Sequence, residues 1–250
     1  MNIMIFDTET TSLDKPFCYN IGYVIYNVEN DKILETKDFV CEQVWHNPML
    51  FSTAYYANKR DLYVRSMRGR NTIMDKFGYI CQQMIRDIKA FNIVGAYAYN
   101  SSFDERVFAF NCDWFKCNNP FDNVPIFDIR GYAHHFICDS EYKDWCEEYE
   151  RFSDSGNYST TAETVYQYVS GNIDFTEEHT ALADSIIECM ILSYAIHVGA
   201  EVNIDYKAFR SVTRHIKKTF NVKYNNEVVF TKEVDTIRYM KNNSTIILKG

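Results

Sequence analysis

The sequence predicts a mixed α/β fold in which several strands come first and strands then alternate with helices. The early segments are apolar or alternate between apolar and polar residues, which is typical of strands. From Asn71 onward, apolar residues recur at three- and four-residue spacing, which is typical of an amphipathic helix. Strands followed by strand–helix alternation favour helices packed in layers on a sheet.

The first three strands are predicted over residues 2–6, 20–28 and 33–45. The turn-like sequence ENDK separates the second from the third, so the connection between them is tight. Tight connections join antiparallel neighbours, and we therefore expect an antiparallel meander at the N-terminus.

The rest of the chain alternates between the two kinds of element. Residues 139–154 hold seven acids and two basic residues, and the following SDSGNYS interrupts any periodic pattern, so an acidic surface insertion is expected at about 137–158. The remaining predicted elements are a helix from residue 71 to 91, a strand at 92–100, a helix through FDERVFAF, a strand at 124–129, and helices at 162–169 and 180–197.

Composition indicates a globular protein. The 250 residues are 46% hydrophobic, enough for one large domain or for one domain with a small appendage. No segment approaches the ~18 apolar residues of a membrane span, and the short apolar start has no basic flank. We therefore expect a cytoplasmic protein with no membrane partner. The eight cysteines contain no C-x-x-C pair, which favours reduced thiols in the core over disulfides or a zinc site.

Net charge separates the two ends of the chain. The total of −8 at first argues against a nucleic-acid partner, because phosphate binding draws on lysine and arginine. Residues 201–250 nevertheless hold ten basic and five acidic residues, a net of +5, which leaves about −13 for residues 1–200. Lys59 to Arg70 adds five basic residues and one acid. Each basic cluster is either a solvated face or a contact for a phosphate backbone.

Acids follow two of the predicted strands. Asp7 and Glu9 lie two residues apart at the end of the first strand, so they share one face and need a cation or a proton between them. Taken alone, this pair also fits an ordinary strand end. Asp104 begins the helix after the strand at 92–100, at an edge where α/β sheets bind ligands, although it also fits a helix-start acid.

A third acid and a histidine lie near the last predicted helix. Asp184 belongs to the helix, and His179 precedes it by five residues. At about 100° per residue the two are about 140° apart on an ideal helix, so they converge only if His179 lies at or before the first turn. Thr176 is a plausible cap that would place it there.

Together, DTETT, NSSFD and HTALAD resemble the three motifs of the DEDDh family, the DnaQ-like branch of the RNase H-like 3'-5' exonucleases. The segments TSLDKPFCYNIGYVIYN and VPIFDIRGYA extend the resemblance to roughly residues 2–200. It implies an RNase H-like fold with a mixed five-stranded sheet, an exonuclease domain at 1–200 and a basic C-terminal extension at 201–250. Ser12, where the family often has glycine, and Tyr99, where histidine is frequent, depart from the pattern.

The resemblance also implies a two-metal phosphodiesterase site. Two divalent ions, Mg²⁺ or Mn²⁺, would be held by four carboxylates, and His179 would be the general base. The implied metal ligands are Asp7, Glu9, Asp104 and Asp184.

The same motifs imply contacts with the substrate. Thr8 and Thr10 would place the terminal nucleotide, Leu13 or Phe103 would pack against its base or sugar, and Asn100 would line the site. For Leu13 and Phe103 a role in core packing is an equal alternative. Glu188, one turn beyond Asp184, is expected to be solvated or to pair along the helix rather than to bind a ligand.

The implied activity is 3'-5' hydrolysis of single-stranded nucleic acid, with release of nucleoside 5'-monophosphates. DNA is favoured, because DTETT is closer to the DNA-directed branch. The alternatives are an oligoribonuclease-like RNA exonuclease and a non-catalytic nucleic-acid-binding module on the same fold. A polymerase or another replication protein is a further candidate partner. The basic extension, expected to form a small helix and a hairpin, would contact the nucleic-acid backbone or dock such a partner.

Overall fold

The computed structural model describes residues 1–207, 212–214, 217–224 and 227–235. Its centre is a six-stranded mixed sheet with the strand order β4-β3-β2-β1-β5-β6. The first three strands form the predicted antiparallel meander, and the other three each run parallel to a neighbour. The strands are β1 (Asn2–Thr10), β2 (Cys18–Asn27), β3 (Lys32–Cys41), β4 (Ile73–Asp75), β5 (Ile93–Ala98) and β6 (Ile126–Asp128).

The sheet has one strand more than the five that the sequence led us to expect. β4 lies in a stretch that was predicted to be the start of a helix, and it pairs with β3 through Ile73 and Met74 opposite Phe39 and Val40. The helix itself begins only at Phe77. The prediction was wrong here because the apolar residues of this short edge strand continue the spacing of the helix that follows.

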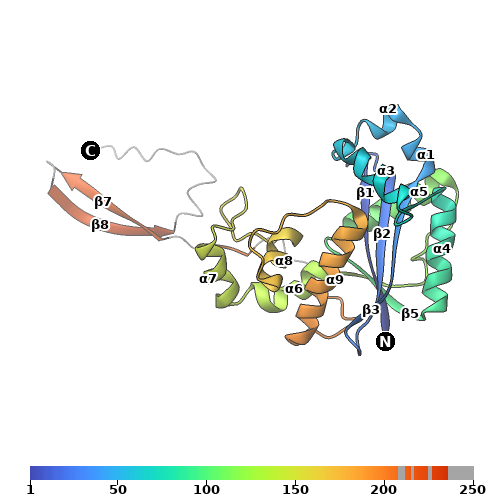
Figure 1. Ribbon diagram of the computed structural model, residues 1–250. Helices are drawn as coiled ribbons and strands as arrows, with labels where there is room; N and C mark the ends of the chain where they lie inside the picture. Colours follow the sequence, from blue (N-terminus) through green and yellow to red (C-terminus); the bar gives the residue numbers. More distant parts are fainter. Residues whose placement is uncertain (208–211, 215–216, 225–226, 236–250) are drawn as a thin grey trace.

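Helices cover both faces of the sheet (Figure 1). Helices α4 and α5 lie on one side, and α9, with α6 and α8 beside it, lies on the other. The helices are α1 (Glu42–Trp45), α2 (Pro48–Phe51), the 3₁₀ helix η1 (Ala57–Lys59), α3 (Arg60–Arg68), α4 (Phe77–Ala90), α5 (Ser102–Phe115), α6 (Ile129–Ile137), α7 (Ser140–Glu148), α8 (Ala162–Ser170) and α9 (Ala181–His197).

Strand β1 divides the core into two layers. Successive side chains of a strand point to opposite faces, and here Met4 and Phe6 join the apolar cluster under α4 and α5. Ile3 and Ile5 join the cluster under α6 and α9. All four side chains are fully buried, so β1 is held from both sides and its carboxyl end is fixed in place.

The acidic segment at 137–158 contains α7 and contributes to the core. Tyr142 and Cys146 are fully buried on one face of this helix, whereas Glu141, Asp144 and Glu148 are exposed on the other. The expectation of a surface insertion therefore describes only the acidic face. The many acids in this segment led us to predict a surface insertion where the chain forms an amphipathic helix.

The C-terminal extension contains a hairpin of its own. β7 (Lys217–Tyr224) and β8 (Glu227–Asp235) pair antiparallel as a separate two-stranded sheet (Figure 1). No helix occurs in the described residues beyond 200, and the strand-like segment at 244–248 lies outside the described residues. Within the described part of the chain, no helix is long and apolar enough to cross a membrane.

Candidate metal centre

Three carboxylates converge at the carboxyl end of β1. Asp7 and Glu9 lie two residues apart on this strand and so share one face, as the sequence predicted. Asp184 reaches the same point from the first turn of α9. One carboxylate oxygen from each of the three lies within 4.8 Å of those of the other two.

The position of Asp184 depends on how closely α9 packs on β2. A Cβ atom at Gly22 would lie only 2.1 Å from the backbone nitrogen of Leu182, so only glycine allows this approach. The Ser185 hydroxyl donates a hydrogen bond of 3.0 Å to the Gly22 carbonyl, and the first N–H of α9 donates one of 2.8 Å to the Asn20 side chain. These contacts fix the start of α9 over the sheet and bring Asp184 to the strand.

Asp104 adjoins this group from the start of α5. Its side chain is buried, and its Oδ1 accepts a hydrogen bond of 2.6 Å from the Thr8 hydroxyl. Asp104 is not a member of the tight three-carboxylate group. Its charge is nevertheless, after burial, the main cause that raises the pKa of Asp7.

The electrostatics of the cluster fit a divalent cation. Burial and then the charge of Asp7 raise the pKa of Asp184 to about 8, and burial raises the pKa of Asp104 to about 7. The Oδ1 atom of Asp184 is buried without a hydrogen-bond partner. A hard cation such as Mg²⁺ takes oxygen ligands, so a cation among these oxygens would both relieve the repulsion and provide the missing partner.

Glu188 also faces the cluster, contrary to the sequence-based expectation that it is solvated or paired along its helix. It is 4% exposed, and its Oε2 accepts a hydrogen bond of 3.2 Å from the backbone N–H of Tyr99. Burial, followed by the charges of Asp7, Asp104 and Asp184, raises its pKa. One feature of the sequence could have indicated this position. Glu188 follows Asp184 by one turn on a helix that is apolar on most sides, so the two acids share a face that packs inward.

His179 lies directly before α9, where it has to lie in order to face the carboxylates. Its backbone is left-handed, with φ of 51°, and the residue that caps the helix is Thr180 rather than the predicted Thr176. Its Nδ1 is 3.4 Å from a carboxylate oxygen of Glu177. Burial, and then the positive charge of Lys59, lower the pKa of His179, which favours the neutral imidazole.

The loop that includes η1 contributes two further side chains, Tyr56 and Lys59, to the surroundings of His179. The Tyr56 ring stacks on His179, with centroids 4.5 Å apart and planes 13° apart. The Lys59 ammonium lies 4.4 Å from the centroid of the Tyr56 ring and donates a hydrogen bond to the Glu178 carbonyl. More than 100 residues separate this loop from His179, so no local pattern could have indicated the contact.

The two threonines that were expected to contact the substrate form hydrogen bonds to other residues of the chain. The Thr8 hydroxyl is buried and donates to Asp104. The Thr10 hydroxyl donates to the Ser12 carbonyl at 3.3 Å. Their contact with a nucleotide remains a prediction, and for Thr8 the hydroxyl is already engaged.

The other three expected substrate contacts lie in different surroundings. Leu13 is 73% exposed in the turn after β1. Asn100 is also exposed, with a left-handed backbone, and donates its N–H to Asp128 at 2.9 Å. Phe103 packs partly against the core beneath α5, which fits the alternative of a packing role. Contact between a nucleotide and Leu13, Asn100 or Phe103 remains a prediction.

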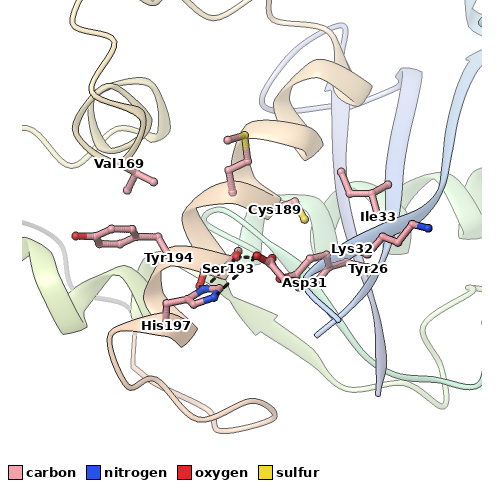
Figure 2. Close-up of a pocket in the computed structure, with 10 residues that line it drawn as sticks. Tyr26, Asp31, Lys32, Ile33, Val169, Cys189, Ser193, Tyr194 and His197 are labelled. Atoms are coloured by element: carbon pink, nitrogen blue, oxygen red, sulfur yellow. Dashed lines mark hydrogen bonds and ion pairs between the residues drawn. The ribbon is translucent and has the colours of Figure 1, made fainter. Parts of the chain in front are cut away.

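A separate hollow of about 490 Å³ lies at the other end of α9 (Figure 2). Asp31, which lines it, accepts a hydrogen bond of 2.9 Å from Ser193, and Nδ1 of His197 lies 2.8 Å from the Ser193 carbonyl. His197 is 13 residues beyond Asp184, or about 20 Å along the helix at ~1.5 Å per residue. The hollow is therefore not part of the carboxylate site.

No family model matches the chain, and no curated protein matches its sequence. Solved structures do share its fold. The nuclease domain of 3'hExo, a DEDDh family member, bound to rAMP, is 14% identical, with 82% of this chain and 96% of that chain covered and a TM-score of 0.54. A full-length 3'-exonuclease is 12% identical, with 83% and 93% covered and a TM-score of 0.55.

A third structure, of 3'-end specific recognition of a histone mRNA stem-loop by a 3'-exonuclease, is 12% identical, with 93% of this chain and 90% of that chain covered and a TM-score of 0.52. At such identities the likeness concerns the fold. The chain has the fold of a DEDDh 3'-exonuclease domain, and the predicted resemblance is confirmed at that level.

Proposed function

We propose that this chain is a metal-dependent 3'-5' exonuclease that hydrolyses the terminal phosphodiester bond of single-stranded nucleic acid and releases nucleoside 5'-monophosphates. The observation that carries the proposal is the convergence of Asp7, Glu9 and Asp184 within 4.8 Å. A half-buried histidine, His179, directly precedes the helix that carries Asp184. The DEDDh-type fold supports it.

The carboxylates would hold two divalent ions, Mg²⁺ or Mn²⁺. Asp7, Glu9 and Asp184 form the tight group, Asp104 stands next to it, and Glu188 adds a further buried acid. A pair of such ions supplies a water of lowered pKa and stabilises the charge on the leaving 3'-oxygen. The Oδ1 atom of Asp184 is buried without a hydrogen-bond partner, so it is available to bind such an ion.

His179 would accept the proton of the attacking water. Its Nδ1 lies beside Glu177, so an Nδ1–H donated to that carboxylate leaves the lone pair of Nε2 for the proton. The stacked ring of Tyr56 restricts the rotation of the imidazole. Burial, followed by the charge of Lys59, lowers its pKa and so keeps it neutral. A base placed in this way typically contributes ~10² to 10⁴-fold to the rate.

DNA is the preferred substrate class in this proposal, on the ground of the DTETT motif. RNA is the second candidate, because structures of similar fold are described with rAMP and with a histone mRNA stem-loop. Digestion of single-stranded DNA, duplex DNA and short RNA of the same sequence, side by side, separates the two. A higher kcat/KM on the RNA than on the single-stranded DNA would show that RNA is the preferred substrate.

Residues 1–200 would form the nuclease domain and residues 201–250 an accessory segment. The net charge of +5 on this segment supports contact with a phosphate backbone. Docking to a polymerase or another replication protein is the alternative. In the described part of the segment, Arg214 pairs with Glu147 of α7, and a bridge joins Val212 to Tyr158.

The test is the release of mononucleotides from a 3'-labelled strand in the presence of Mg²⁺ or Mn²⁺. The parent chain is expected to release the label at once and to shorten a 5'-labelled strand stepwise. Asp7→Asn is expected to abolish release, and His179→Ala to slow it by ~10² to 10⁴-fold.

Asp113→Asn is the matched control, because this aspartate lies on α5 with its side chain 86% exposed, and it should retain full activity. Absence of release by the parent chain with either ion would overturn the proposal in favour of a non-catalytic binding module.

A further inference from the structure

Three cysteines from separate turns of the chain meet beside α4 and α5. Cys81 belongs to α4, Cys112 belongs to α5, and Cys117 follows the end of α5. Their sulfur atoms all lie within 4.8 Å of one another. Their spacing along the chain did not predict this group, because it contains no C-x-x-C pair.

The backbone is shaped to bring Cys117 back over α5. The residue that caps the end of α5, Lys116, has a left-handed backbone with φ of 55°, and the N–H of Cys117 donates to the Cys112 carbonyl at 3.1 Å. On α4, a Cβ atom at Gly78 would lie 3.4 Å from Cβ of Cys117 and 4.0 Å from its sulfur. These are ordinary van der Waals distances, so the Cys117 side chain packs directly against α4 at this position.

The geometry suits a shared ion better than a disulfide. Three thiolates at ~2.3 Å from one zinc ion have their sulfurs about 3.8–4.0 Å apart, so a modest contraction of the observed group is sufficient. A disulfide joins only two sulfurs, at ~2.05 Å, and leaves the third cysteine without a role. Cys81 and Cys112 are buried, whereas Cys117 is half-buried, which gives an ion a route from solvent.

The chemistry of the three side chains selects the class of cation. The thiolate is the form of cysteine that binds metals, and thiolates select soft cations over the hard ones that carboxylates prefer. The cysteine group and the carboxylate group thus suit different metals.

We propose that Cys81, Cys112 and Cys117 form a second metal centre, which binds one thiophilic cation of the Zn²⁺ class through three thiolates and leaves a fourth position open to water. Binding replaces the thiol protons, which pass to solvent. The ion would tie α4 to the end of α5. Asp104 lies eight residues before Cys112 on α5, about 12 Å away along the helix. The proposed cysteine centre is therefore separate from the carboxylate centre.

Cadmium provides the test, because its bonds to thiolates absorb in the ultraviolet and its bonds to carboxylates do not. The full chain, reduced and freed of metal by a chelator, is titrated with Cd²⁺ in excess Mg²⁺, which occupies the carboxylates. One equivalent of Cd²⁺ per chain is expected to saturate the thiolate absorption, and Zn²⁺ is expected to displace it. Each of Cys81→Ser, Cys112→Ser and Cys117→Ser should weaken binding at least ~100-fold.

The controls are Cys146→Ser, a buried cysteine of α7, and Cys138→Ser, a half-buried one, and both should bind Cd²⁺ like the parent chain. Circular dichroism of each variant shows whether weaker Cd²⁺ binding comes from a missing ligand or from a chain that no longer folds. The titration of the parent chain tests the proposal without any variant. No thiolate absorption in the reduced parent chain would overturn the proposal, as would the same absorption in all three cysteine variants. Neither outcome depends on nuclease activity.

Discussion

At the scale of single residues, the side chains around His179 govern its protonation. The ring stacks on Tyr56, Glu177 lies beside Nδ1, and burial, followed by the charge of Lys59, lowers the pKa of the imidazole. The same charge offsets part of the rise that burial and neighbouring carboxylates cause in the pKa of Glu9 and Asp184. One ammonium group therefore favours both the neutral imidazole and the ionised carboxylates at the same pH.

Replacing this lysine should move the pH dependence of the reaction. In Lys59→Met the pKa values of His179, Glu9 and Asp184 all rise, because the neighbouring positive charge is lost. We expect the acid limb of log(kcat/KM) against pH to move to higher pH, with a smaller loss at about pH 8 than at about pH 6.

Lys32→Met is the control, since this exposed lysine begins β3 opposite Asn27 of β2, and its profile should overlay that of the parent chain. A uniform loss of rate at every pH would contradict the electrostatic role of Lys59.

The residues of the site differ in how far the sequence could predict them. The strand period predicted that Asp7 and Glu9 share one face, whereas Asp184 was predicted only because HTALAD completes the set of three motifs. Glu188 was misjudged, because no sequence pattern tells a buried helix face from an exposed one when apolar residues lie on most sides. Tyr56 could not be found at all, since its contact with His179 is purely tertiary.

At the scale of elements, the site depends on the close packing of α9 on β2. The approach is set by Gly22, whose absent side chain leaves room for the backbone of Leu182. Gly22 is also paired with Asp7 across the strands, so a displacement of α9 acts directly on the proposed metal ligands.

Gly22→Ala is therefore expected to reduce both stability and activity. The added methyl group overpacks rigid backbone, which costs about 1–3 kcal/mol of unfolding free energy even after relaxation. Asp184 would move away from Asp7, so activity should fall further than stability explains. Urea unfolding and the exonuclease assay measure the two effects.

Gly69→Ala is the matched control, because an added Cβ atom there meets its nearest neighbour only at 3.4 Å and the backbone is right-handed. Equal behaviour of the two alanine variants would show that the packing of α9 does not depend on Gly22.

The elements also show which parts of the fold the sequence could predict. The meander was predictable, because apolar alternation and the ENDK turn mark its strands directly. β4 and α7 were not, because three edge residues merge into the spacing of α4 and because acids obscure the buried face of α7. Both errors arose where a short or polar element depends on its neighbours for its conformation.

At the scale of the whole molecule, the buried acids make the metal-free protein sensitive to pH. Asp104 and Glu177 have their pKa raised to about 7, and Asp184 to about 8, chiefly by burial. The folded chain holds these protons more tightly than the unfolded chain. The stabilisation that these protonated carboxyl groups give to the fold is thus fully present below about pH 4 and is lost as the pH rises toward 8.

Asp184→Asn tests this linkage, because it removes one of the three titrations. In a chelator at about pH 8 the variant is expected to be at least ~1 kcal/mol more stable than the parent chain, which corresponds to a thermal midpoint about 2–4 °C higher. The advantage should shrink toward about pH 4, and excess Mn²⁺ should reverse it by stabilising the parent chain.

Asp113→Asn, at an exposed position, should follow the parent chain at every pH. A variant no more stable than the parent chain in chelator at about pH 8 would show that the buried carboxylate does not titrate as described.

The two-sided burial of β1 has a consequence for how this chain can change in length. Because Met4 and Phe6 fill one layer and Ile3 and Ile5 the other, loss or gain of a single residue before Asp7 would exchange the contents of both layers at once. It would also turn the first carboxylates away from Asp184. Insertions and deletions should therefore be tolerated at the turn between β2 and β3, whereas the opening strand admits substitutions only.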